Sequence, residues 1–356
     1  MKLFTCFNCG NLLYFENTAC TSCGAALGFF PDDMILGAMT PTGTDNLWLA
    51  QHNQRRYKMC ENYAVHQVCN WMVAQQSQES FCPACRLNRT IPDLSSGDNI
   101  RLWHTLEIEK HRLVYSLLRM GLPLAPRSQR QDGLEFDFLA DNANLFSERK
   151  RVLTGHAAGL ITLNIAEADP VLREKMRNDM AEPYRTLLGH FRHEAGHYYW
   201  GRLVAGTSWH EPFRHLFGDE TADYGASLER YYAQGPVANW QESFVSSYAS
   251  THPWEDWAET WAHYLHIADT LETASQFGLR IAPAAGQDPK LAVGLETLDP
   301  YQPISFDELI TDWLPLTFAL NSLNRSMGHA LAYPFVIVPA VMEKLAFIHR
   351  LVSAYR

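Results

Sequence analysis

Apolar residues recur at helical spacing over several long stretches of the chain, which predicts a mostly helical protein. In residues 99–120, Leu102, Leu106 and Leu113 fall on one helical face between charged residues, and Gly121 then interrupts the pattern. By the same reasoning, further helices are expected over 169–180, 183–204, 219–233, 253–275, 306–324 and 338–355.

A few shorter stretches have the two-residue alternation of β-strands. Residues 134–139 alternate in this way, and residues 152–163 contain a turn region between Gly155 and Gly159, which predicts a β-hairpin. Residues 29–55 are rich in proline and glycine, so a loop-rich connector is expected there. The pattern as a whole indicates an α+β fold that is mostly helical and contains a small β-sheet.

Composition limits the classes of protein that the chain can belong to. Its 356 residues allow two or three domains, and with 47% hydrophobic and 19% charged residues it can bury a sizeable core. A net charge of −10 argues against a general nucleic-acid binder. The apolar stretch 330–342 is too short to cross a membrane, and the first residues lack the apolar run of an export signal. We therefore expect a cytoplasmic protein, whose cysteines serve as metal ligands rather than in disulfides.

The first four cysteines have the spacing of a structural zinc site, C-x2-C-x10-C-x2-C. Four thiolates complete a tetrahedral zinc site and leave no position for water. Gly10 and Gly24 each follow one C-x-x-C pair, where the chain must turn tightly. The alternative is a pair of disulfides. We expect a zinc ribbon over residues 1–28, with these ligands: Cys6, Cys9, Cys20 and Cys23.

The other four cysteines are spaced less regularly, as C-x8-C-x12-C-x2-C. They predict a second closed zinc site within residues 29–98, although only the last pair forms a regular knuckle. His66 could replace one of the first two of these cysteines, and the alternative is a buried thiol pair beside one knuckle. The expected ligands are Cys60, Cys69, Cys82 and Cys85.

Residues 192–197 contain the sequence H-E-x-x-H within a predicted helix. His193 and His197 are four residues apart, so they project from one helical face and can bind the same metal ion. Zinc lowers the pKa of a bound water, and Glu194 is placed to accept its proton as a general base. This motif is the main candidate for catalysis.

A catalytic zinc site needs a third protein ligand and one open position. Glu255 and Glu259 lie four residues apart in the helix that Pro253 is expected to start, so both face the same way. One can bind the metal, and the other can accept a hydrogen bond from a liganding histidine. The alternative is two solvated carboxylates near a helix N-terminus.

These two motifs together resemble the gluzincin metallopeptidases. In thermolysin-like enzymes the first acid of such a pair binds zinc and the second supports a histidine, which implies Glu255 as the ligand and Glu259 as the histidine's partner. The local sequence also resembles that of anthrax lethal factor, with a tyrosine seven residues before the liganding glutamate. That resemblance implies Tyr248 as a donor to the oxyanion. The 57 residues between His197 and Glu255 exceed the thermolysin spacing, so the fold between them is not carried over.

Across nearly its whole length the chain resembles a bacterial family of zinc-binding metallopeptidases with an N-terminal zinc ribbon. The resemblance rests on Cys69-Asn-Trp, residues 82–94, residues 193–200, Phe217-Gly-Asp-Glu and residues 254–266. It implies a zincin-like catalytic domain over residues 99–356.

The sequence thus predicts a zinc-dependent hydrolase of peptide or related amide bonds, with one catalytic and up to two structural zinc ions. The expected partners are a peptide or protein substrate and, through the ribbon, another protein. Nucleic acid and membrane are not expected as partners. The alternative is a protein-interaction module on a zincin scaffold without turnover, although a structural zinc site would not need Glu194.

Overall fold

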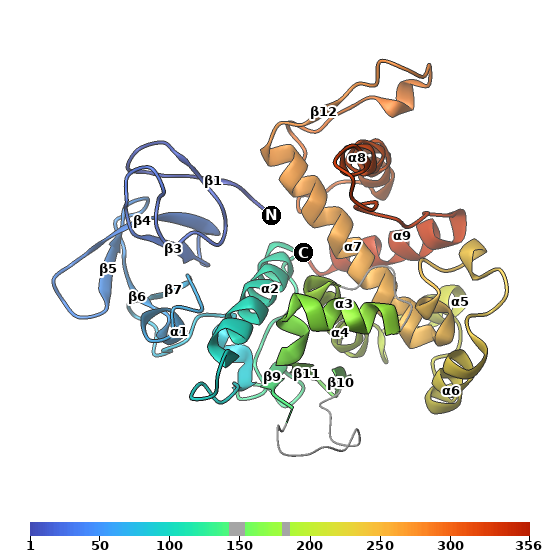
Figure 1. The fold of residues 1–356 in the computed structure, drawn as a ribbon, viewed down its shortest axis with the longest axis horizontal. Helices are drawn as coiled ribbons and strands as arrows, with labels where there is room; N and C mark the ends of the chain where they lie inside the picture. Colours follow the sequence, from blue (N-terminus) through green and yellow to red (C-terminus); the bar gives the residue numbers. More distant parts are fainter. Residues whose placement is uncertain (142–153, 180–185) are drawn as a thin grey trace. The chain divides into compact units, whose positions relative to one another are not determined.

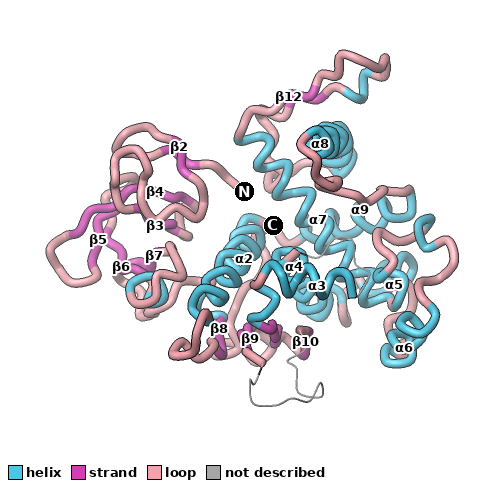
Figure 2. Tube along the Cα trace, in the orientation of Figure 1, coloured by secondary structure: helices cyan, strands magenta, loops and turns pink. Residues whose placement is uncertain are grey.

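The computed structural model describes residues 1–141, 154–179 and 186–356 (Figures 1 and 2). The chain forms two compact units. The first comprises Met1–Tyr115 and Leu124–Leu188, and the second comprises Ser116–Pro123 and Gly189–Arg356.

A five-stranded antiparallel sheet in the first unit replaces the loop-rich connector expected over residues 29–55. The strands pair in chain order: β3 (Leu27–Phe30), β4 (Ile35–Pro41), β5 (Leu47–Ala50), β6 (Arg56–Met59) and β7 (Met72–Ala74). The expectation was wrong because β3 is buried at all four positions and β4 at four successive ones, so polar and apolar residues do not alternate along them. Pro31 and Gly43 lie in the turns between strands rather than in one long loop.

The N-terminal cysteine pairs lie in tight turns beside the short hairpin of β1 (Phe4–Thr5) and β2 (Leu12–Leu13). The Gly10 amide donates to the Cys6 carbonyl at 2.8 Å, and the Gly24 amide donates to the Cys20 carbonyl at 2.9 Å. Both glycines have positive φ, 75° and 71°, which glycine adopts without steric cost. The predicted turns after the two C-x-x-C pairs are confirmed.

The small sheet expected from the sequence is also in the first unit, with the strand order β10-β11-β9-β8. The predicted hairpin is confirmed from residue 154 onward, because β10 and β11 pair antiparallel; residues 152–153 lie outside the described residues. β11 and β8 run parallel to β9. The bounds of these elements and the accompanying helices are β8 (Asn88–Thr90), α2 (Asn99–Arg119), β9 (Glu135–Leu139), β10 (Gly155–Ala157), β11 (Leu160–Asn164) and α3 (Pro170–Asp179).

The second unit is mostly helical and also contains one short antiparallel pair of strands, β12 (Arg280–Ile281) and β13 (Val293–Gly294). Its helices, with α4 starting just before the boundary, are α4 (Leu187–Tyr199), α5 (His210–Phe217), α6 (Tyr224–Gln234), α7 (Pro253–Gln276), α8 (Phe306–Ser326) and α9 (Pro339–Ala354). A π-helical turn, Trp200–Val204, follows α4 directly. In Figure 1, α7 runs as a long helix past α8 and α9. The helices expected over 253–275, 306–324 and 338–355 are therefore confirmed.

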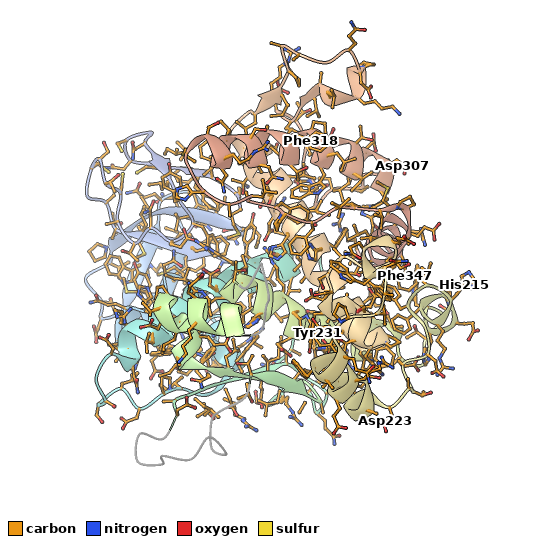
Figure 3. All side chains as sticks on the ribbon, turned by 45° about the vertical axis from the view of Figure 1, so that its right-hand side comes forward. His215, Asp223, Tyr231, Asp307, Phe318 and Phe347 are labelled. Atoms are coloured by element: carbon orange, nitrogen blue, oxygen red, sulfur yellow. The ribbon has the colours of Figure 1, made fainter. Side chains whose placement is uncertain are left out.

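The helix expected over residues 219–233 starts later than predicted, and α5 before it was missed. Asp223 caps α6 by accepting a hydrogen bond from the Ala226 amide at 3.0 Å (Figure 3). Glu220 instead accepts hydrogen bonds from Arg214 of α5. Pro212 does not interrupt α5, because it lies in the first turn, where a missing N–H costs nothing.

α7 is the core of the second unit and buries side chains around most of its circumference. Its start is well defined, because the His252 ring accepts a hydrogen bond from the Trp254 amide at 3.1 Å and Pro253 occupies the first turn. Glu255 lies in that same turn, where the helix dipole favours a negative charge.

Candidate metal centres

α4 packs closely against the first half of α7, and a glycine inside the H-E-x-x-H sequence makes this possible. A Cβ on Gly196 would lie 3.0 Å from the Ala258 Cα and 3.2 Å from the Trp261 Cβ. The Trp257 indole donates a hydrogen bond to the Gly196 carbonyl at 2.8 Å. A larger residue would push the helices apart. The missing side chain therefore allows the α4 histidines to approach the α7 carboxylates.

A buried ion pair ties the same two helices together. Arg192, which precedes His193, is 2% exposed and pairs with Asp269 of α7. Asp269 also accepts hydrogen bonds from the Ser116 hydroxyl, at 2.9 and 2.8 Å, and from the Tyr301 hydroxyl. Breaking such a buried pair leaves an uncompensated charge, so the network opposes rotation of α4 against α7.

Three side-chain donor atoms converge where these helices meet. The His193 and His197 Nε2 atoms lie 3.2 Å apart, and Glu255 Oε2 lies 3.0 Å from His193 Nε2. Glu255 is 1% exposed, and its Oε2 has no hydrogen-bond partner among the described residues. Two ring nitrogens and a buried carboxylate oxygen this close together are a costly arrangement unless a proton or a metal cation lies between them. Two histidines and one glutamate are a donor set that zinc uses in catalytic sites.

The other ends of these ligands are held in place by neighbouring side chains. His193 Nδ1 bonds to Glu259 Oε1 at 2.8 Å, and the Ser246 hydroxyl donates to Glu259 Oε2 at 2.7 Å. The Tyr224 hydroxyl donates to Glu255 Oε1 at 2.7 Å. These bonds direct His193 Nε2 and Glu255 Oε2 to the common point, as partners of metal ligands commonly do.

The charges of the cluster keep its carboxylates ionised. Burial raises the pKa of Glu255, but the charges and hydrogen bonds of His197 and His193 outweigh this and hold the pKa well below its usual range. Burial likewise lowers the pKa of His193, and Glu255 and Glu259 raise it well above its usual range. An ionised carboxylate is the form that binds a metal, and bound metal displaces the proton from the histidine.

Glu194 and Tyr248, the other two residues expected at the site, lie in the second unit with the cluster. The Tyr248 ring centroid lies 6.0 Å from that of His193. Glu194 is 9% exposed, and its charge is one of the causes that raise the pKa of Tyr224, after burial and the charge of Glu255. Burial, followed by the charge of Glu255, raises the pKa of Tyr248, so its phenol keeps its proton and stays a donor.

Two residues of this network were missed in the sequence. Tyr224 lies at the start of α6, and Ser246 lies in the segment before α7. Neither has a regular spacing to the motif, and only the folded chain brings them to Glu255 and Glu259. Glu255 and Glu259 could be found because a helix places residues i and i+4 on one face.

The first cysteine centre lies at the two N-terminal turns. The sulfur of Cys6 lies 3.8 Å from that of Cys23, and the sulfur of Cys9 lies 3.6 Å from that of Cys20. One donor atom from each of the four lies within 4.8 Å of the others. Tetrahedral zinc with Zn–S bonds of about 2.3 Å separates its sulfurs by about 3.8 Å, so the spacing fits.

The second cysteine centre is fully buried, and its four sulfurs also lie within 4.8 Å of one another. Backbone amides donate to three of them at 3.2–3.3 Å: Trp71 to Cys69, Cys82 to Cys60, and Cys85 to Cys82. His66 is not part of this group, and its ring instead packs against Trp103. A different histidine, His111 of α2, lies beside the sulfurs.

Comparisons with known proteins agree with this layout. Residues 99–351 match the family described as "Putative zinc-binding metallo-peptidase", and residues 3–96 match a zinc-ribbon domain. Uncharacterized proteins of Mycobacterium tuberculosis (strain H37Rv) and Mycobacterium bovis are each 45% identical over 355 residues, covering 99% of this chain and 96% of theirs. No solved structure matches. Among the described residues, no helix combines the length and apolar character needed to cross a membrane.

Proposed function

The chain belongs to this zinc-binding metallo-peptidase family, and on that basis we propose that it hydrolyses a peptide or related amide bond at the His193–His197–Glu255 site. The observation that carries the proposal is the convergence of two imidazole nitrogens and one buried carboxylate oxygen. Three protein donors leave one tetrahedral position open, which distinguishes a catalytic zinc site from a closed structural one.

Zinc bound by these donors would lower the pKa of water and polarise the carbonyl group of the scissile bond. Glu194 accepts the proton of the water that attacks this carbonyl, and later gives it to the amine that leaves as the C–N bond breaks. Tyr248 donates a hydrogen bond to the oxygen on which negative charge develops. Glu259 keeps the His193 ring oriented through its Nδ1 atom.

The same proposal includes two structural zinc ions, one in each cysteine centre, so that three zinc ions bind per chain. Their ligands are all the cysteines of the chain, Cys6, Cys9, Cys20 and Cys23 in the first centre and Cys60, Cys69, Cys82 and Cys85 in the second. The surface around the first centre is the expected contact for a protein partner.

The test compares three full-length variants loaded with zinc. Wild type and each variant are incubated with a denatured protein and a mixed peptide library, and cleavage is followed by mass spectrometry. Glu194→Gln should keep its zinc and lose roughly 10²–10⁴-fold in turnover, because it removes the base and no ligand. Glu255→Ala should lose the zinc of this site. Glu211→Gln, an exposed glutamate of α5, is the matched control and should behave as wild type.

Two outcomes would count against the proposal. If Glu194→Gln cleaves as fast as wild type, the base is another group. If the zinc-loaded wild type cleaves nothing while the zinc-ribbon region captures a protein partner, the chain is an interaction module on a zincin scaffold.

A further inference from the structure

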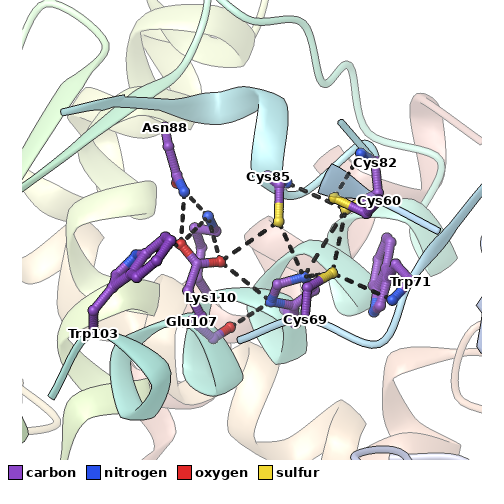
Figure 4. A network of polar contacts seen from close by, with 10 residues as sticks. Cys60, Cys69, Trp71, Cys82, Cys85, Asn88, Trp103, Glu107 and Lys110 are labelled. Atoms are coloured by element: carbon purple, nitrogen blue, oxygen red, sulfur yellow. Dashed lines mark hydrogen bonds and ion pairs between the residues drawn. The ribbon is translucent and has the colours of Figure 1, made fainter. Parts of the chain in front are cut away.

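The second cysteine centre has a neighbour that the sequence did not predict. His111 of α2 is 4% exposed, and its Nε2 atom lies 3.2 Å from the sulfur of Cys69. Figure 4 shows the four cysteines of this centre beside Glu107 and Lys110 of α2. It lies beyond the zinc-ribbon match, which ends at residue 96. The sequence between the cysteines and His111 has no metal-ligand spacing, so only the fold reveals the contact.

The hydrogen bond made by Nδ1, the ring nitrogen away from the sulfurs, shows that Nε2 carries the free lone pair. His111 Nδ1 lies 2.5 Å from the Glu107 backbone carbonyl, which can only accept a hydrogen bond. The Nδ1 atom therefore carries a proton, and in the neutral ring Nε2 has the free lone pair. Metal-binding histidines have this arrangement, with the second ring nitrogen donating to a carbonyl or carboxylate.

The distances from His111 Nε2 to three sulfurs match those between ligands of one metal ion. They are 3.2 Å to Cys69, 3.7 Å to Cys85 and 4.0 Å to Cys82. With Zn–N of about 2.0 Å and Zn–S of about 2.3 Å, tetrahedral zinc separates these atoms by about 3.5 Å. The Cys69 and Cys82 sulfurs lie 3.9 Å apart, near the corresponding value of about 3.8 Å.

The same three sulfurs therefore belong to two possible tetrahedra. Cys60 completes one of them, since its sulfur lies within 4.8 Å of the sulfurs of Cys69, Cys82 and Cys85. His111 completes the other. The centre has five donors for four positions.

A buried polar network holds the His111 ring in this position. Glu107, one turn before His111 on α2, and Lys110, directly before it, are both fully buried and form an ion pair at 2.8 Å. The Trp103 indole donates to Glu107 at 3.0 Å, and the Asn88 amide donates to it at 2.7 Å. The His111 ring also packs edge-on against Trp71. These contacts fix the helix turn that carries the imidazole, so it stays near the sulfurs.

The first cysteine centre lacks this feature. The donor group of Cys6, Cys9, Cys20 and Cys23 includes no histidine in the part of the chain that the structure describes. The side chain that reaches it is the Asn8 amide, 3.3 Å from the Cys23 sulfur, which donates a hydrogen bond and is not a zinc ligand. The two centres therefore differ in how many ligands they can lose.

We propose that His111 is an alternative ligand of the second zinc centre: when Cys60 is lost, His111 Nε2 binds the metal together with Cys69, Cys82 and Cys85. The centre then keeps its zinc when Cys60 is lost, whereas the first centre cannot lose a cysteine. This inference does not depend on peptidase activity.

The test measures zinc per chain in purified full-length variants, together with thermal unfolding. Cys60→Ser should retain as many zinc ions as wild type, and His111→Ala should also retain them because the four cysteines remain. The double variant Cys60→Ser/His111→Ala should lose one zinc ion. Cys82→Ser is the matched control in the same centre and should lose one zinc ion alone, as should Cys9→Ser in the first centre.

Cobalt substitution gives a second reading of the same site. Cobalt-loaded Cys60→Ser should show weaker sulfur-to-metal charge transfer than wild type, because a nitrogen replaces a sulfur, and the band should vanish for this centre in the double variant.

Three results would overturn the proposal. In the first, Cys60→Ser loses one zinc ion as Cys82→Ser does. In the second, the double variant retains the same zinc as Cys60→Ser. In the third, both Cys60→Ser and Cys60→Ala fail to fold, because a bound His111 would have kept the metal and with it the local structure.

Discussion

The cysteine centres of the first unit and the histidine–glutamate site of the second unit are assembled in different ways. Each cysteine centre draws its sulfurs from tight turns and short loops. The histidine–glutamate site takes its three donors from two helices that are already held together by Gly196, Trp257 and the Arg192–Asp269 pair. In a cysteine centre, a bound metal would order the surrounding chain. At the histidine–glutamate site, it would bind to side chains that the fold already holds in position.

Metal removal should separate the two kinds of centre most clearly. With increasing chelator, zinc should leave the His193–His197–Glu255 site first, without unfolding, because packing holds this site together. Loss of the cysteine-bound zinc should unfold the segments around it, since binding and folding are coupled there. Hydrogen exchange read by mass spectrometry, together with zinc counts, checks this. Exchange that rises first across residues 189–356 would reverse the assignment of structural and catalytic centres.

Removing a partner of a metal ligand should have the next largest effect. Glu259→Ala frees the His193 ring and should weaken zinc binding at this site by roughly 10–100-fold while leaving the site detectable. Competition with a chromogenic chelator measures the affinity, and Glu229→Ala, on the exposed side of α6, is the control. If Glu259→Ala abolishes zinc binding and Glu255→Ala preserves it, the two carboxylates exchange roles.

The contact between α4 and α7 can be tested with one methyl group. Gly196→Ala should reduce the free energy of unfolding by about 1–3 kcal/mol, because the added carbon meets the α7 backbone. Gly201→Ala is the control, since a Cβ there has nothing within 4 Å. Denaturant titration of both variants gives the difference. Equal stability would mean that the helices shift apart at no cost, and zinc affinity at the site should then fall instead.

The smallest effects should come from the two tyrosines, and they should differ in kind. Tyr224→Phe removes the hydrogen bond to Glu255 and should weaken zinc binding by a few-fold, about 1 kcal/mol. Tyr248→Phe should leave zinc affinity unchanged and lower turnover. Both variants keep the ring, so packing is preserved. The reverse pattern would assign the oxyanion contact to Tyr224.

Local patterns in the sequence predicted those parts of the molecule that depend on local geometry. The long helices and the hairpin before residue 164 follow from spacing, and so do the shared faces of His193 with His197 and of Glu255 with Glu259. The sheet of β3–β7 was missed because β3 and β4 are buried at successive positions, so apolar and polar residues do not alternate along them. α5 was missed because a proline such as Pro212 ends a helix in its interior but is tolerated in its first turn, and the sequence does not say which applies.

Contacts between residues far apart in the sequence could not be predicted from the sequence. Tyr224, Ser246 and His111 reach their partners only through the fold. Spacing alone does not distinguish Glu255 from Glu259 as the third zinc ligand, so the choice between them rested on the resemblance to known enzymes. His66 was the nearest histidine in sequence to the second cysteine centre, and His111 is the one beside it in space.

The π-helical turn after α4 has a consequence for how the chain can change over evolutionary time. A π turn is equivalent to one extra residue inserted into a helix, and here it falls at Trp200–Val204, just after His197. Deleting one residue there would restore regular helix and rotate only the segment on its C-terminal side. Relatives could therefore gain or lose this residue. The segment after the turn would then be rotated, while the spacing of His193 and His197 stays unchanged.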